Sequence, residues 1–187
     1  ATNTNQAIFN FNGTDGVVQN INVQSDVPHI DFVVGSQAYV KLLNNLRITN
    51  NTSLTVNGIF DADDKILSGN SNVNQTLTVA ATGTFKTANS LGFSGGTATS
   101  VDTSSTNNIN VINLASGSTV EYTRAGDQVI TNQTGVGQGT LGNYSNLKIS
   151  GNGIKTAAVG DTNVQNMTTV SSGELRVPAT AENVKPN

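Results

Sequence analysis

Short runs in which apolar residues alternate with Thr, Asn, Lys or Arg recur along the whole chain. This two-residue period predicts β-strands with one buried face. No segment shows a sustained apolar period of 3.6 residues, so a doubly wound α/β fold is excluded. The predicted strands are 7–11, 17–23, 29–34, 39–42, 46–49, 53–56, 65–67, 75–79, 84–87, 109–114, 119–122, 128–131, 147–149, 162–165, 167–170 and 174–177.

One unit, made of a strand, a small-residue corner and a second strand, occurs at 76–88, 109–122 and 168–177. In addition, 45–50 (NLRITN) and 146–151 (NLKISG) share a pattern of Asn, Leu, a basic residue, Ile and a hydroxyl. Internal self-similarity of this kind is typical of a stacked array.

We therefore expect an all-β fold, a parallel β-helix or β-solenoid, in which Val, Ile, Leu and Phe point inward and Thr, Lys and Asn point outward. Asn side chains can bond to one another at stacked corners. A β-sandwich of repeats remains the alternative, because it also contains many short alternating strands. The whole chain, 1–187, is expected to form a single repetitive region with weak sub-units 1–44, 45–142 and 143–187.

Composition narrows the class of protein. Only 35% of residues are hydrophobic and 11% are charged, with a net charge of −3 and no Cys. Low net charge argues against ordinary disorder, and the lack of basic clusters argues against nucleic-acid binding. No apolar run is long enough for a membrane-spanning helix. The opening residues lack signal-peptide features. Because 184–187 also read as a linker, we expect a segment of a longer protein.

The sequence FDADDK contains the candidate metal ligands Asp61, Asp63 and Asp64. Three carboxylates within four residues could supply oxygen ligands to calcium, although the EF-hand pattern is not present. The alternative is a solvated acidic turn. No other cofactor is expected.

No catalytic motif is found, and we expect the chain not to be an enzyme. His29 and Asp31 are expected on the same face of a strand. This placement suits an acid–base pair, but it suits a plain hydrogen bond equally well. The remaining acids are scattered along the sequence rather than paired, although polysaccharide-degrading β-helices use grouped carboxylates. The large side chains of Phe85 and Tyr122 are expected to fill the coil interior rather than to bind sugars.

The C-terminal part resembles a unit of large repetitive cell-surface adhesins of Bacteroidota, of the gliding-adhesin kind. The match also includes 117–122 with 126–130, and departs from the unit at Asn163 and Met167. The matching residues are Tyr144, Asn146, Leu147, Ile149, Gly151, Gly153, Lys155, Thr156, Gly160, Asp161, Thr162, Val164, Asn166, Thr169, Val170, Ser171, Ser172, Gly173, Leu175 and Val177.

This resemblance implies a right-handed β-helix, secretion by the type IX system and a location on the bacterial cell surface. The implied partners are neighbouring repeats of the same polypeptide, secretion and outer-membrane attachment proteins, and surface glycans. We therefore expect a structural or adhesive segment of a filamentous adhesin, involved in attachment or gliding. The alternatives are a carbohydrate-binding module and a polysaccharide-degrading β-helix enzyme.

Overall fold

The computed structural model describes residues 6–14, 16–70, 74–104, 106–132, 143–159 and 162–178. Within these residues the regular structure consists of strands, and no helix is formed that could cross a membrane. All strand pairs are parallel, and each joins one coil to the next. The β-solenoid expectation is therefore confirmed, and the β-sandwich alternative is wrong.

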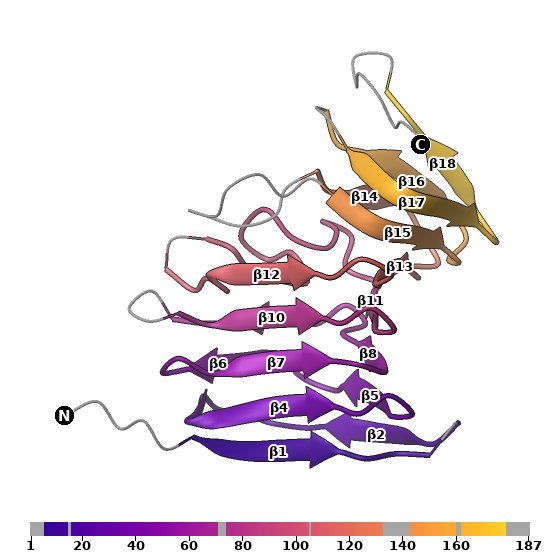
Figure 1. Ribbon diagram of the computed structural model, residues 1–187. Helices are drawn as coiled ribbons and strands as arrows, with labels where there is room; N and C mark the ends of the chain where they lie inside the picture. The colour runs from indigo at the N-terminus through magenta and orange to yellow at the C-terminus, as the bar shows by residue number, and fades with distance from the viewer. Residues whose placement is uncertain are drawn as a thin grey trace.

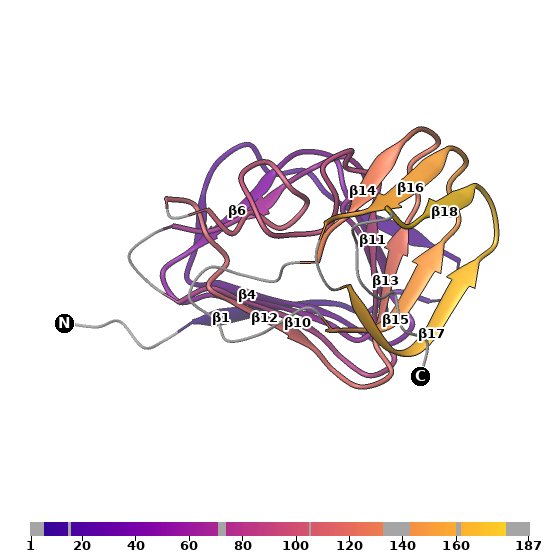
Figure 2. The ribbon, with the colours of Figure 1, turned by 90° about the horizontal axis from the view of Figure 1, so that it is seen from above.

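The chain winds as a right-handed coil with the N-terminal coil at the bottom of Figure 1. In Figure 2, seen from above, it runs along the front sheet and then turns back along a second sheet on the right. Sheet 1 has the order β1-β4-β7-β10-β12. Its strands are β1 (Ala7–Phe11), β4 (Ile30–Val34), β7 (Ser53–Val56), β10 (Thr76–Val79) and β12 (Val111–Leu114).

Sheet 2 contributes one strand to each of seven coils and is the longest sheet, with the order β2-β5-β8-β11-β13-β15-β17. Its strands are β2 (Val18–Ile21), β5 (Tyr39–Leu42), β8 (Ile59–Asp61), β11 (Thr84–Thr87), β13 (Thr119–Tyr122), β15 (Asn143–Ile149) and β17 (Asn163–Val170).

Two three-stranded sheets close the coil, one in each half of the molecule. Sheet 3 contains β3 (Val27–Pro28), β6 (Leu46–Thr49) and β9 (Leu67–Ser68). Sheet 4 contains β14 (Gln128–Ile130), β16 (Ile154–Ala157) and β18 (Glu174–Arg176). Among the described residues sheet 1 ends at β12, and the described strands of the upper coils belong to sheets 2 and 4.

The coil repeat is much shorter than the sequence similarity indicated. Phe32 pairs with Leu54 and Leu54 with Leu77, which are steps of 22 and 23 residues. The NLRITN and NLKISG stretches are not equivalent, because β6 belongs to sheet 3 and β15 to sheet 2. The units at 76–88 and 109–122 do occupy equivalent positions, since β10 pairs with β12 and β11 with β13.

Columns of inward side chains form the core of the first five coils. Val40, Phe60, Phe85 and Val120 are in register on sheet 2 and are at most 1% exposed. The rings of Phe60 and Phe85 lie 5.4 Å apart. Burial of such side chains stabilises each by about 1.5–3 kcal/mol. The expected interior positions of Phe85 and Tyr122 are confirmed, because both side chains are fully buried.

The long connection between β11 and β12 adds a further aromatic residue to this core. Phe93 reaches into the coil and lies edge-on to Phe85, with ring centroids 5.1 Å apart. Above it, the hydroxyls of Tyr122 and Tyr144 are hydrogen-bonded at 2.8 Å. Burial raises the pKa of both tyrosines. The interior thus becomes more polar toward the C-terminal coils.

Lys155 is the most unusual interior residue, because it points inward from β16 and is fully buried. Its Nζ donates to the backbone carbonyls of Arg124, Gly126, Gly151 and Asn152, at 2.9, 3.0, 3.3 and 2.6 Å. Two of these oxygens belong to the preceding coil and two to its own turn. Burial lowers the pKa of the Lys155 amine. The side chain therefore ties two stacked corners together through an ammonium group.

Close stacking explains why these corners contain glycine. A Cβ on Gly151 would lie 2.0 Å from the carbonyl oxygen of Arg124. Gly173, with φ +78°, stacks on Gly151 in the same way. A Cβ on Gly173 would lie 2.4 Å from the carbonyl oxygen of Gly151. At the other corners Asn side chains do bond across coils, as expected, and Asn44 Nδ2 donates to Asn22 Oδ1 at 2.5 Å.

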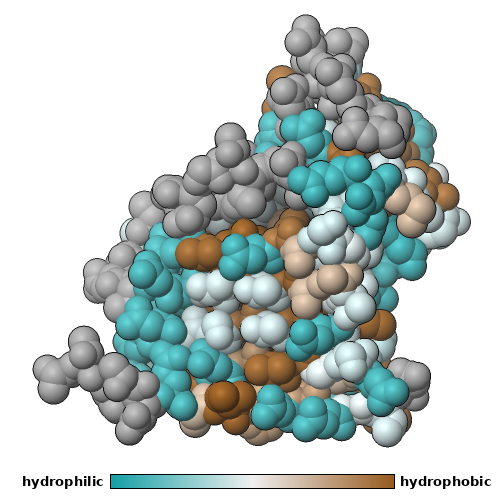
Figure 3. Space-filling view, in the orientation of Figure 1, coloured by the Kyte–Doolittle hydropathy of each residue, from teal (hydrophilic) through white to brown (hydrophobic). Residues whose placement is uncertain are grey.

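The terminal coils are less well covered than the middle ones. Phe9 has the register of the inward Phe32 but is 51% exposed, and Val170 has the register of Ile149 but is 45% exposed. In Figure 3 a brown, apolar patch is visible over β1, the middle of the same face is paler, and a second brown stretch lies at the level of β12. Apolar packing is therefore concentrated between β4 and β15.

Candidate functional site

Charged residues form one column on the outer face of sheet 2. The strand register places Lys41, Asp61, Lys86, Glu121 and Lys148 next to one another on successive coils. Neighbouring strands in a sheet are about 4.8 Å apart. The five residues, which we call the charge ladder, alternate in sign from one coil to the next.

Alternation allows the two acidic members to be buried. Asp61 and Glu121 are only 7% and 6% exposed, although their register points them outward. Glu121 accepts from the Nζ of Lys148 at 3.2 Å and from the Oγ of Ser150 at 2.5 Å. A buried carboxylate needs such partners, since an unpaired buried charge is costly. The ladder therefore joins neighbouring coils electrostatically.

Asp61 is held by a different set of donors. The hydroxyl of Tyr39 donates to Asp61 Oδ2 at 2.8 Å, and the backbone N–H of Asp63 donates to Oδ1 at 2.9 Å. Desolvation, together with the bond to Asp61, raises the pKa of Tyr39 to about 12. The Nζ of Lys86 lies 5.4 Å from the centre of the Tyr39 ring, within cation–π range.

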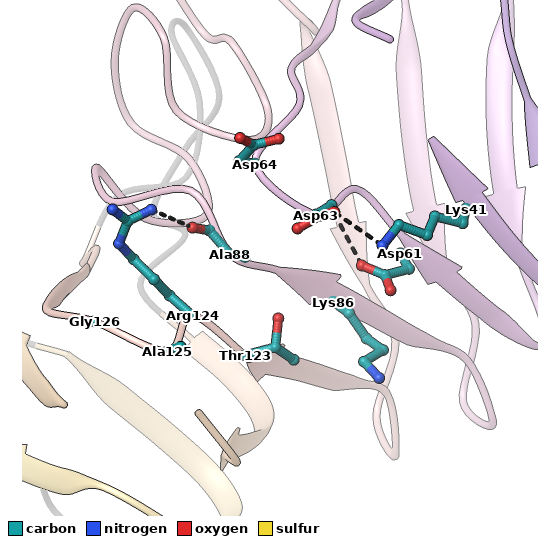
Figure 4. Close-up of a pocket in the computed structure, with 10 residues that line it drawn as sticks. All are labelled: Lys41, Asp61, Asp63, Asp64, Lys86, Ala88, Thr123, Arg124, Ala125 and Gly126. Carbon is teal, nitrogen blue, oxygen red and sulfur yellow. Dashed lines mark hydrogen bonds and ion pairs between the residues drawn. The ribbon is translucent and has the colours of Figure 1, made fainter. Parts of the chain in front are cut away.

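A groove with a volume of about 530 Å³ opens beside the ladder, where sheet 2 passes into the following turns. Figure 4 shows its lining: Lys41, Asp61, Asp63 and Asp64 on one side, Lys86 and Thr123 along the strands, and Arg124 with its neighbouring turn on the other. Four successive coils contribute residues, from β5 to the turn after β13.

The three predicted calcium ligands lie in this groove but each has its own partner. Asp63 pairs with Lys41 at 2.9 Å, and Asp64 pairs with Lys65. The bond to Lys65 lowers the pKa of Asp64. Among the described residues, no group of three acidic, His or Cys side chains is arranged to share a metal ion. Calcium binding stays a prediction.

Two cations of the groove remain available. Lys86 and Arg124 form no ion pair with any carboxylate of the described chain. Arg124 uses Nη1 to donate to the carbonyl of Ala88 at 3.1 Å, which fixes the guanidinium in place. Figure 4 shows the two side chains extending away from each other, with Thr123 between them.

His29 and Asp31 do not form a pair. His29 sits at a corner with φ 60°, and its Nε2 lies 3.3 Å from the amide nitrogen of Asn50. Asp31 accepts instead from the backbone and hydroxyl of Ser53, at 2.7 and 2.9 Å. Both residues help to stack coils. The structure does not bring them together as an acid–base pair.

Most of the groove was missed by reasoning from sequence. The acids had been judged scattered, yet strand pairing aligns Asp61 and Glu121, which are 60 positions apart in the numbering. A usable signal exists: in YVKL, IFD, TFKT, TVEY and NLKI a charged residue directly follows a buried apolar one.

Of the turn residues that match the adhesin unit, Gly160 and Asp161 lie outside the described residues, as does the expected linker 184–187.

No protein-family model matches the chain, and no curated protein or solved structure does so either. The resemblance to surface adhesins thus remains an expectation from the residues quoted above. The function has to be argued from the solenoid and its charged face.

Proposed function

We propose that this chain is a structural and adhesive segment of a bacterial cell-surface protein, located outside the cell, and that it acts through reach and stiffness rather than catalysis. The observation that carries the proposal is the seven-stranded sheet 2, which is continuous from β2 to β17. Each coil contacts mainly its neighbours, so coils can be added without redesign of the rest.

The outer surface is consistent with this role. Thr55, Thr76 and Thr78 face outward on sheet 1, and the charge ladder largely neutralises itself. Surfaces with little net charge do not attract partners non-specifically. Asp61, Asp63 and Asp64 each bond to separate groups, an arrangement suited to holding coils rather than to moving protons.

A second candidate, a carbohydrate-binding module, is favoured by the groove and its two unpaired cations. The two functions are compatible, because a stalk can also present a lateral binding face.

Duplication of one coil tests the stalk. Residues 30–51 span one coil, because Phe32 pairs with Leu54. Three extra tandem copies should lengthen the fold by about 14 Å at roughly 4.8 Å per coil. We expect cooperative unfolding, a larger maximum dimension in small-angle scattering, and preserved attachment by the cells that display the protein.

The matched control inserts Gly/Ser-rich segments of the same length at the same point, which should interrupt the stack. Loss of attachment by the coil-extended protein, while it remains folded and surface-exposed, would contradict a function based on reach.

A further inference from the structure

We propose that the groove beside the charge ladder binds an extended acidic oligosaccharide, with one anionic group at Lys86 and another at Arg124. The inference names a ligand for this face and does not depend on whether the chain serves as a stalk.

The attraction for an anion comes from two cations of the groove that form no ion pair within the described chain. Three carboxylates and three cations line it. Lys41 is used by Asp63, and Asp64 is paired with Lys65, which is outside the lining. Lys86 and Arg124 thus have no carboxylate partner among the described residues, although both are only partly exposed. Partial burial strengthens their attraction for an incoming anion.

The geometry requires more than one anionic group. Lys86 lies on β11, whereas Arg124 follows β13 on the next coil, and Figure 4 shows their charged ends pointing apart across the groove. A single small anion would contact only one of them. A polymer with a negative charge on each unit can reach both, and guanidinium groups bind carboxylates and sulfates through paired hydrogen bonds.

The remaining lining favours a sugar over other polyanions. Thr123 offers a hydroxyl, and Asp63 and Asp64 offer carboxylate oxygens that can accept from sugar hydroxyls. A nucleic acid or an acidic peptide offers fewer hydroxyls to these carboxylates than a sugar does.

The test is titration calorimetry of the full chain at low salt, with a chelator present, against a hexamer of galacturonic acid. A sulfated hexasaccharide separates sulfate from carboxylate recognition. A neutral maltohexaose, poly-glutamate and single-stranded DNA complete the panel. We expect binding of the acidic sugars, weakening with salt, and much weaker binding of the other three.

The variants locate the site. Lys86→Gln and Arg124→Gln should each weaken binding about tenfold, the effect of losing one charge-assisted contact, and the double variant should weaken it by roughly their product. Arg176→Gln is the control, because Arg176 is an exposed cation that pairs with the exposed Glu174 and does not line the groove, and it should change affinity less than twofold. Circular dichroism checks that each variant is folded.

The proposal is overturned if the unmodified chain binds neither of the two acidic sugars. It is also overturned if maltohexaose, poly-glutamate or DNA binds as tightly as the acidic sugars, or if the double variant binds them as tightly as the parent does. None of these results concerns coil duplication, so the stalk and the groove succeed or fail separately.

Discussion

The lower and upper coils of this solenoid are held together in different ways. Between β4 and β13 the interior is a column of Val, Leu and Phe, with Phe60 and Phe85 at its centre. Above it, Gln128 and Lys155 point inward and bond to backbone carbonyls, and the Tyr122–Tyr144 pair replaces aliphatic contacts. The same coil geometry can thus be stabilised by apolar volume or by polar groups that hold the corners.

This difference predicts unequal tolerance to substitution. An apolar column accepts side chains of similar volume, whereas a set of donors and acceptors fails when one donor is lost. The following experiments test that contrast, starting with the largest effect.

Lys155→Met keeps most of the length of the side chain but removes all its donors. Four carbonyl oxygens then lose their shared partner. We expect a loss of about 3 kcal/mol in the free energy of unfolding, measured in urea. Arg176→Met is the control, since its side chain is 54% exposed and pairs with the equally exposed Glu174, so it should cost under 1 kcal/mol. Equal losses in the two variants would refute the corner role of Lys155.

Gln128→Leu tests the second polar corner. Gln128 Nε2 donates to the carbonyls of Thr87 and Asn89 at 3.0 and 2.9 Å. We expect about 1–2 kcal/mol of destabilisation by the same assay, because two buried hydrogen bonds are lost, although each carbonyl keeps a backbone N–H donor, from Thr123 or Gly92. Gln37→Leu, at an exposed position, should be nearly neutral. A stabilised Gln128→Leu protein would show that this interior prefers apolar residues after all.

Phe60→Leu is the corresponding change in the lower coils. Phe60 is fully buried between Val40 and Phe85. The smaller leucine should cost about 1–2 kcal/mol, because it leaves a small cavity in an otherwise apolar column. If this variant loses as much stability as Lys155→Met, the apolar lower coils are no more tolerant of substitution than the polar upper coils, and the predicted contrast is wrong.

Tyr39→Phe should cost about 1 kcal/mol at neutral pH, because the buried carboxylate of Asp61 loses one of its donors, and its distinctive effect is a change in pH dependence. The pKa of Tyr39 is about 12 in the folded chain and about 10 when unfolded. Between these values the unfolded chain has released the proton and the folded chain retains it, so stability falls as pH rises from about 10 to 12. Urea unfolding at several alkaline pH values should show a shallower fall for the variant.

The parent-minus-variant difference is the quantity to follow in that experiment. Burial lowers the pKa of Lys155, which acts in the opposite direction by making stability rise with pH in the alkaline range. The effect of Lys155 is common to both proteins and cancels. Identical slopes would show that the Tyr39–Asp61 bond does not persist in solution.

Local pattern was sufficient to predict many strands. Those at 39–42, 46–49, 53–56, 84–87 and 119–122 have the predicted bounds, because each has a clear two-residue alternation. The strand Ile59–Asp61 was missed, since it is three residues long and its Asp61 was assigned to an acidic turn. The two predicted strands at 162–165 and 167–170 form one strand, β17.

The strand Ile154–Ala157 was missed for a different reason, since a lysine at an inward position contradicts the usual pattern. Only the stacking of two corners creates the set of carbonyls that Lys155 needs. The charge ladder has a local signal, a charged residue after a buried apolar one, but its alignment was missed because the steps are unequal. Phe60, Phe85, Val120 and Leu147 follow one another at 25, 35 and 27 residues. Alignment of their charged neighbours depends on pairing that no fixed period reveals.

Parallel pairing between coils has a mechanical consequence. If tension on the chain ends detaches a terminal coil, the ladder to its neighbour opens while the remaining coils keep theirs. A coil such as the one from Phe32 to Leu54 adds only one strand spacing to the height, but contains 22 residues. Pulled straight, these span roughly 70 Å at about 3.3 Å per residue. Each peeled coil would therefore absorb work over a distance about fifteen times the height lost, and the protein would lengthen under load in steps before it broke.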